Sequence, residues 1–176
     1  LEREEGHQNA TLIMHTDPHD HEGPNLIMVA EKLGVNSSVF FSNQRLEFEK
    51  INVLYNISDF CLNISYAEGF GLGTLEAMMT GTPIIAAKTG GLTRQVVDHR
   101  DGSENGVAID IATKTLVGSQ TVPYIYEDYA NEKDVADAIF KIYNLSPDEK
   151  VALGEKVRSY ALSEFAYEKT IELWDD

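Results

Sequence analysis

The sequence has little positive charge, only one cysteine and no long apolar run. Its 176 residues carry 14 lysines and arginines against 29 aspartates and glutamates, a formal net charge of −15. Nucleic acids and anionic membrane surfaces are bound by clustered lysine and arginine, so the composition argues against nucleic acid as a partner. A small anionic ligand remains compatible, because charges more than about 8 Å away are largely screened at physiological salt.

The scarcity of cysteine and of apolar runs also bears on location. A single cysteine, Cys61, excludes an intramolecular disulfide and fits a reducing compartment. No apolar stretch reaches the roughly 18 residues expected of a membrane-spanning helix, and no signal peptide is recognisable. We therefore expect a cytoplasmic protein, whose length fits a single domain over residues 1–176.

Short apolar segments alternate with amphipathic ones through the first 111 residues. The pattern predicts strands over 10–15, 38–41, 60–65, 83–87 and 106–111. It predicts helices over 25–33, 48–57, 72–80 and 92–97. This alternation is typical of the α/β class, and specifically of a Rossmann-like, doubly wound, mostly parallel sheet with flanking helices.

The alternation ends after residue 111. Two β-prone pieces around Gly118 predict an irregular hairpin over residues 112–129. A helix is expected over residues 132–143. A second helix is expected to start at Ser146 and Pro147, and the last one to cover residues 157–174. The tyrosines of the hairpin could form an acceptor or partner surface, although covering a core edge is the commoner role of such residues: Tyr124, Tyr126 and Tyr129.

A glycine-rich turn between a predicted strand and a predicted helix is the strongest local signal. Residues 68–91 read EGFGLGTLEAMMTGTPIIAAKTGG, in which a helix starts near Leu72 and stops at Gly81. Glycines let backbone N–H groups approach a ligand closely, and a helix N-terminus adds roughly half a positive charge. We therefore predict an anion site at this turn, which is neither a P-loop nor a G-x-G-x-x-G turn.

Two glutamates flank the turn, Glu68 and Glu76. Glu76 is expected on the same arc of the helix as Leu72, Leu75 and Met79, which we expect to be buried; a carboxylate there needs donors. Its donors would be ligand hydroxyls such as a ribose pair, or the glutamate is simply favoured near the helix N-terminus. Glu68 is either a solvated loop residue or a second ligand contact.

The segment SYAEGFGLGTLEAMMTGTPIIAAKTGG resembles the central motif of retaining glycosyltransferases with the GT-B fold, including two glutamates separated by seven residues. The resemblance extends to YNISDF, GGLTRQVVD, NGVAI and DVADAIFKIY, and omits only residues 112–129. It implies one half of a GT-B fold, the C-terminal donor-binding domain of a longer two-domain enzyme. Such an enzyme transfers a sugar from a nucleotide-diphosphate sugar to an acceptor, with retention of anomeric configuration.

The resemblance implies a role for each residue of the motif. A catalytic glutamate and three backbone amides would hold the donor sugar: Glu68, Gly69, Phe70 and Gly71. Two further amides would face the diphosphate: Leu72 and Gly73. Glu76 would hold the ribose hydroxyls. Four residues would lie beside the base: Ser42, Asn43, Gln44 and Arg45. The family needs no cofactor and no catalytic metal.

The sequence also departs from the family pattern. The family has a further strand and helix before the region where this chain starts, and they carry an arginine and a lysine that grip the diphosphate. We expect this first strand, which lies in the middle of the sheet, and the N-terminal acceptor domain to be missing here. The chain alone is then expected to be inactive; the acceptor is unknown, and any peripheral membrane contact would run through the missing half. Arg94 replaces a glutamate of the family, and a surface role is expected for it.

Other functions remain open at this point. The alternative from a different class is a non-catalytic nucleotide-sugar-binding module; within the fold, an epimerase or a phosphorylase is a rival. One cluster lies outside the resemblance: His15, Asp17, His19, Asp20 and His21. These side chains could ligate a transition metal, but their spacing fits no closed zinc site, and we favour a polar loop without a metal.

Overall fold

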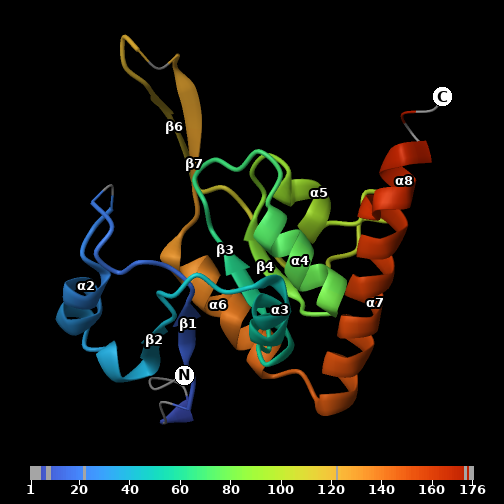
Figure 1. Ribbon diagram of the computed structural model, residues 1–176, viewed down its shortest axis with the longest axis horizontal. Coiled ribbons are helices and arrows are strands. Elements are labelled where there is room, and N and C mark those ends of the chain that lie inside the picture. Colours follow the sequence, from blue (N-terminus) through green and yellow to red (C-terminus); the bar gives the residue numbers. More distant parts are fainter. Residues whose placement is uncertain (1–4, 7–8, 22, 122, 173, 175–176) are drawn as a thin grey trace. The chain divides into compact units, whose positions relative to one another are not determined.

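The computed structural model describes residues 5–6, 9–21, 23–121, 123–172 and 174 (Figure 1). Internal contacts divide the chain into two compact units, 1–47 and 48–176, and each is described here by itself. The single domain expected over residues 1–176 stays a prediction.

The first unit contains a pair of parallel strands and a helix between them. β1 (Leu12–Met14) pairs with β2 (Val39–Phe41) in parallel, with Leu12 opposite Val39. α2 (Leu26–Leu33) begins after Asn25, whose side chain accepts a hydrogen bond from the Met28 N–H. It ends at Gly34 in the left-handed conformation, before the short 3₁₀ helix η1 (Asn36–Ser38). The predicted strand–helix–strand order of this region is confirmed.

The second unit is built on a parallel sheet in the order β3–β4–β5. These strands are β3 (Cys61–Asn63), β4 (Ile84–Ala87) and β5 (Gly106–Ile109). The helices are α3 (Phe48–Asn56), α4 (Leu72–Thr80), α5 (Leu92–Val96), α6 (Glu132–Tyr143), α7 (Pro147–Phe165) and α8 (Tyr167–Glu172). The structure confirms the α/β class, with parallel strands between flanking helices.

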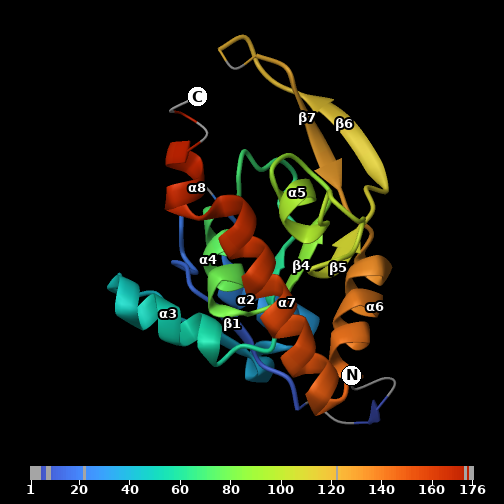
Figure 2. The same ribbon diagram turned by 90° about the vertical axis from the view of Figure 1, so that its right-hand side faces the viewer.

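Alternate residues of β4 point to two separate cores, as expected of a strand in the middle of a sheet. Ile84 and Ala86 belong to a core that includes residues of α4, α5 and α7. Ile85 belongs to the other, with residues of β5 and α6. Figure 2 shows α6 on one side of the strands and α7 on the other. Helices therefore cover both faces, which is the doubly wound arrangement.

The C-terminal helices differ from the prediction. α7 begins at Pro147, where Ser146 and Glu149 form a capping box, so the predicted start signal is confirmed. A single helix over 157–174 is wrong, because Ala166 is extended, with φ −61° and ψ 148°, and separates α7 from α8. No glycine or proline marks this break. Leu173, within the predicted helix, lies outside the described residues.

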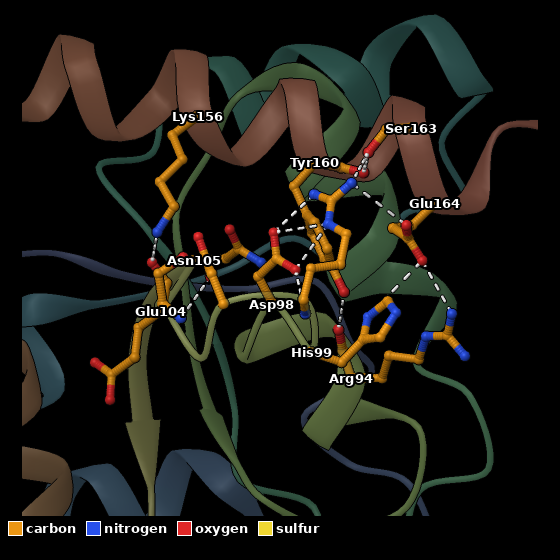
Figure 3. Close-up of polar contacts among 12 residues, drawn as sticks. Arg94, Asp98, His99, Glu104, Asn105, Lys156, Tyr160, Ser163 and Glu164 are labelled. Carbon is orange, nitrogen blue, oxygen red and sulfur yellow. Dashed lines mark hydrogen bonds and ion pairs between the residues drawn. The ribbon is translucent and has the colours of Figure 1, made fainter.

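Polar contacts fasten α7 to the segment around α5 (Figure 3). Glu164 of α7 pairs with Arg94 at 2.9 Å and with Arg100 at 3.4 Å. Arg100 also donates to the buried Asp98 and holds the pKa of that carboxyl down, at about 2. Tyr160 donates to the Arg94 carbonyl oxygen at 2.6 Å. Arg94 therefore has a structural role at the surface, as the sequence indicated.

The hairpin predicted over residues 112–129 is present. β6 (Thr113–Val117) and β7 (Ile125–Tyr129) are antiparallel, with Thr113 opposite Tyr129, and the hairpin projects beyond the sheet in both views (Figures 1 and 2). Residue 122, near its tip, lies outside the described residues. Tyr124 and Tyr126 are exposed, at 73% and 60%. Tyr129 instead stacks on Tyr66, with ring centroids 4.4 Å apart, so the three tyrosines do not share one environment.

Within the described residues, no helix combines the length and the apolar character needed to cross a membrane.

Candidate functional site

The glycine-rich turn lies at the carboxyl end of β3, next to the turn that follows β4. The two strands are parallel neighbours, with Asn63 opposite Ala86. Residues 64–71 therefore leave the sheet at the same edge as residues 88–91, and each segment leads into a helix, α4 or α5. In open α/β sheets, ligands bind at this carboxyl edge.

The two turns pack together through their backbones. The N–H of Gly91 donates to the carbonyl oxygen of Glu68 at 3.3 Å. A Cβ atom on Gly90 would overlap that oxygen, and one on Gly91 would lie 2.6 Å from the Cα of Phe70. Gly90 also has a φ of +47°, a backbone angle that residues with a side chain rarely adopt. Only glycine fits this approach, so the backbone at Glu68 is fixed from one side.

Two fully buried side chains, Gln95 and Thr74, also hold the turn. Gln95 of α5 donates to the carbonyl oxygens of Phe70, at 2.7 Å, and Gly71, at 3.2 Å. The hydroxyl of Thr74 lies 2.6 Å from Gln95 Oε1 and 2.8 Å from the Gly71 oxygen, and its single proton is shared between these two acceptors. Buried polar groups that are satisfied in this way hold one conformation. These hydrogen bonds therefore hold the start of α4, at Gly71, against α5.

The carbonyl groups of the turn are used, but its amides are not. Among the described residues, none accepts a hydrogen bond from the N–H groups of residues 69 to 73. The first helical bond of α4 runs from Leu75 N–H to the Gly71 oxygen. Residues 69, 70, 72 and 73 are exposed, and all five N–H groups lie at or just before the N-terminus of α4, the positive end of its dipole. Unpaired amides at a helix N-terminus can bind an anion, and the predicted anion site stays a prediction.

Glu68 and Glu76 differ in their surroundings. Glu68 is half-buried in the loop, whereas Glu76 is exposed on α4. The carboxylate of Glu76 accepts a hydrogen bond from the Tyr55 hydroxyl of α3 at 3.0 Å. Desolvation of Tyr55, followed by this hydrogen bond, raises the pKa of the phenol well above its usual value, so it stays a donor at physiological pH.

The burial expected for the face of α4 that carries Glu76 is confirmed only in part: Leu75 and Met79 are half-buried and pack against the core. Leu72 is 69% exposed, and the residues buried on this helix are Thr74, Ala77 and Met78. The apolar residues of α4 surround most of the helix, so periodicity alone did not select a face. Packing against α7 selects it: Gly154 approaches Gly81 so closely that a Cβ on Gly154 would lie 2.8 Å from the Gly81 oxygen. Glu76 therefore needs no buried donors and is open to a ligand.

A largely apolar cavity of 340 Å³ lies between α3 and α4, beside the Tyr55–Glu76 pair. Phe48, Ile51 and Met79 contribute to its lining. The sequence does not predict this cavity, because it arises from packing between two helices and has no local motif. The role of Gln95 was not predicted either. Its spacing could have indicated burial, because it lies three residues after Leu92, on the same buried face of α5 as Leu92 and Val96.

The remaining predicted residues belong to the first unit. Residues 42–45 follow β2, and Ser42 N–H donates to the Met14 oxygen at 2.9 Å. Their predicted place beside the base stays a prediction. In the histidine cluster, His15 hydrogen-bonds Ser42 at 3.0 Å, and His19 N–H donates to Asp17 at 2.9 Å. No group of three potential ligands is placed to hold a metal ion in the described part of the chain.

Comparison with known proteins gives consistent sequence matches. A family model described as "Glycosyl transferases group 1" matches residues 20–159. The chain is 33% identical over 147 residues to a D-inositol 3-phosphate glycosyltransferase of Corynebacterium jeikeium, covering 84% of this chain and 29% of that protein. It is 37% identical over 78 residues to the protein of that name in Mycolicibacterium smegmatis, covering 44% of this chain and 18% of that protein. The chain thus spans less than a third of either relative.

Solved structures match over most of the chain. A sucrose-phosphate synthase from Thermosynechococcus elongatus superposes with a TM-score of 0.69 and 24% identity, over 94% of this chain and 37% of that one. Anabaena HepE in complex with UDP and glucose gives a TM-score of 0.68 and 21% identity, over 94% and 40%. Starch synthase IV of Arabidopsis thaliana bound to ADP and acarbose gives 0.61 and 22%, over 91% and 31%. At these identities the likeness shows the fold alone.

Proposed function

Because this chain belongs to the glycosyl transferases group 1 family, we propose that it is the donor-binding domain of a retaining glycosyltransferase. The donor is a nucleotide-diphosphate sugar, and the wider protein transfers its sugar to an acceptor. The observation that carries this proposal is the row of five unused amides at residues 69–73, on a turn whose backbone is fixed by Gly90, Gly91 and Gln95.

The proposed chemistry follows from where charge develops. When the bond from sugar to diphosphate breaks, negative charge grows on the departing diphosphate. The amides of Leu72 and Gly73, at the start of α4, stabilise that charge without reorganisation, since the turn is already held in place. Glu68, with the amides of Gly69 to Gly71, holds the donor sugar next to the reacting bond.

Glu76 is proposed to bind the ribose of the donor. Its carboxylate is exposed, lies one turn into α4 from the diphosphate amides, and accepts a hydrogen bond from Tyr55. Two neighbouring ribose hydroxyls can donate to one carboxylate. The names of two similar structures support a nucleoside diphosphate as the ligand, since HepE is described with UDP and starch synthase IV with ADP.

The acceptor side is proposed to lie outside this chain. The relatives named D-inositol 3-phosphate glycosyltransferase are more than three times as long as the segment that matches here. We propose that these 176 residues bind the donor, and that sugar transfer requires an acceptor domain of the same enzyme. A non-catalytic nucleotide-sugar-binding module would show donor binding but no sugar transfer in the full-length protein.

The ribose assignment is tested by calorimetric titration of UDP and ADP against the wild type and Glu76→Ala. Hydrogen bonds to a charged group contribute about 1.5–3 kcal/mol, so the variant should bind about 10- to 100-fold more weakly. Glu155→Ala, an exposed glutamate of α7, is the matched control and should bind as the wild type does. Equal affinities for wild type and Glu76→Ala would refute the assignment.

A further inference from the structure

The β6–β7 hairpin is anchored at its root by one buried carboxylate, Asp128, which is 9% exposed. One carboxylate oxygen accepts a hydrogen bond from the Thr89 hydroxyl at 2.8 Å. Lys114 of β6 lies 3.1 Å from the other oxygen, as an ion pair outside hydrogen-bonding geometry. The backbone N–H of Asp128 donates to the Tyr66 oxygen at 2.7 Å. A buried carboxylate is costly without such partners, so this arrangement specifies the position of β7.

Both protein partners outside the hairpin belong to the two turns of the donor site. Tyr66 lies two residues before Glu68 in the loop after β3. Thr89 directly precedes Gly90, the residue whose backbone lies against the Glu68 oxygen. Asp128 therefore contacts the segment that carries Glu68 directly at Tyr66, and indirectly through Thr89 and Gly90. In Figure 1 the root of the hairpin lies beside the loop that links β3 to α4.

Two further observations support a specific link. Tyr129 stacks on Tyr66, with ring centroids 4.4 Å apart, so two successive residues of β7 contact the same loop residue. The hydrogen bond from Thr89, followed by the contact with Lys114, holds the pKa of Asp128 below its usual value. The carboxylate is thus charged at physiological pH, when it is the stronger acceptor.

We propose that Asp128 is a positioning residue of the donor site, through which the β6–β7 hairpin fixes the loop that carries Glu68. It touches no part of the ligand site itself; it acts through Tyr66 and Thr89. The expected effect on donor affinity rests on the proposed function. The expected effect on the rigidity of residues 66–71 does not.

The test uses Thr89→Val, which preserves the size of the side chain and removes its hydroxyl donor, in the full chain. Hydrogen exchange of the Asp128 and Gly91 amides, which donate to the carbonyl oxygens of Tyr66 and Glu68, should become several-fold faster in the free protein, because the loop loses one of its anchors. Titration of UDP and ADP should show binding about 3- to 10-fold weaker, the size of one lost hydrogen bond. In Asp128→Asn the side chain is a weaker acceptor and loses the ion pair with Lys114. This variant should also show faster hydrogen exchange and weaker nucleotide binding.

Two controls separate positioning from general destabilisation. Thr89→Ser retains the hydroxyl and should restore exchange and affinity to near wild-type values. Tyr124→Ala alters an exposed residue near the hairpin tip and should change neither. Unchanged exchange of the Asp128 and Gly91 amides in Thr89→Val, or a Thr89→Ser variant as impaired as Thr89→Val, would overturn the proposal.

The two hypotheses fail differently. If the loop loosens in Thr89→Val but the wild type binds neither nucleotide, the positioning role stands and the proposed function is wrong. If the wild type binds a nucleotide and Thr89→Val leaves loop and affinity unchanged, the proposed function stands and the positioning role is wrong.

Discussion

The two glutamates of the site are held in opposite ways. The backbone at Glu68 is enclosed: Gly90 and Gly91 pack against this turn, and Gln95 donates to the carbonyl oxygen of Phe70, two residues after Glu68. Glu76 is on the exposed side of α4, and Tyr55 is the one hydrogen-bond donor to it among the described residues. One region has a rigid backbone that presents amides, whereas the other has a side chain that can adjust to a ligand.

This difference suggests a division of labour. Stabilising charge on a leaving group requires donors that are already in place, which the enclosed turn provides. Binding a flexible ribose requires only a carboxylate within reach. Substitutions should therefore lower the free energy of unfolding strongly around Glu68 and only slightly around Glu76.

The largest effect is expected for Gly90→Ala. The added methyl group would overlap the Glu68 oxygen, and a φ of +47° strains any residue with a side chain. We expect the free energy of unfolding to fall by about 3 kcal/mol or more, measured by urea denaturation. Gly69→Ala is the matched control in the same loop: nothing lies within 4 Å of its added Cβ, so its change should stay within about 0.5 kcal/mol. Similar losses for both variants would show that the turn is not enclosed as described.

A smaller loss of stability is expected for Gln95→Leu. Leucine fills similar space but cannot donate, so the part-buried carbonyl oxygen of Phe70 loses its partner and the buried Gly71 oxygen loses one of its donors. An unsatisfied buried group costs about 1–3 kcal/mol, which urea denaturation should detect. Thr93→Ala, at an exposed position of the same helix, should be nearly neutral. If Gln95→Leu were also neutral, the turn would be held by the glycines alone.

The contrast also explains how far the sequence could predict the site. The turn, the limits of α4 and the strand that follows depend on local signals, chiefly Gly71 and Gly81 in the left-handed conformation, and these were predicted correctly. The face of α4, the break at Ala166 and the cavity beside Tyr55 depend on which distant segments pack there. Local periodicity contains no such information, so the environment of Glu76 had to come from the structure, as did the roles of Gln95 and Asp128.

The smallest effect on stability is expected for Tyr55→Phe, which removes the one hydrogen bond to Glu76. Because the carboxylate is exposed, water replaces the lost hydroxyl, and the free energy of unfolding should change by less than about 1 kcal/mol. Nucleotide affinity should fall about two- to threefold, since the carboxylate loses the group that orients it. Tyr124→Phe, at an exposed tyrosine of the hairpin, should leave both quantities unchanged. A loss of stability as large as that of Gln95→Leu would mean that Glu76 belongs to the rigid framework, and the contrast between the two glutamates would then disappear.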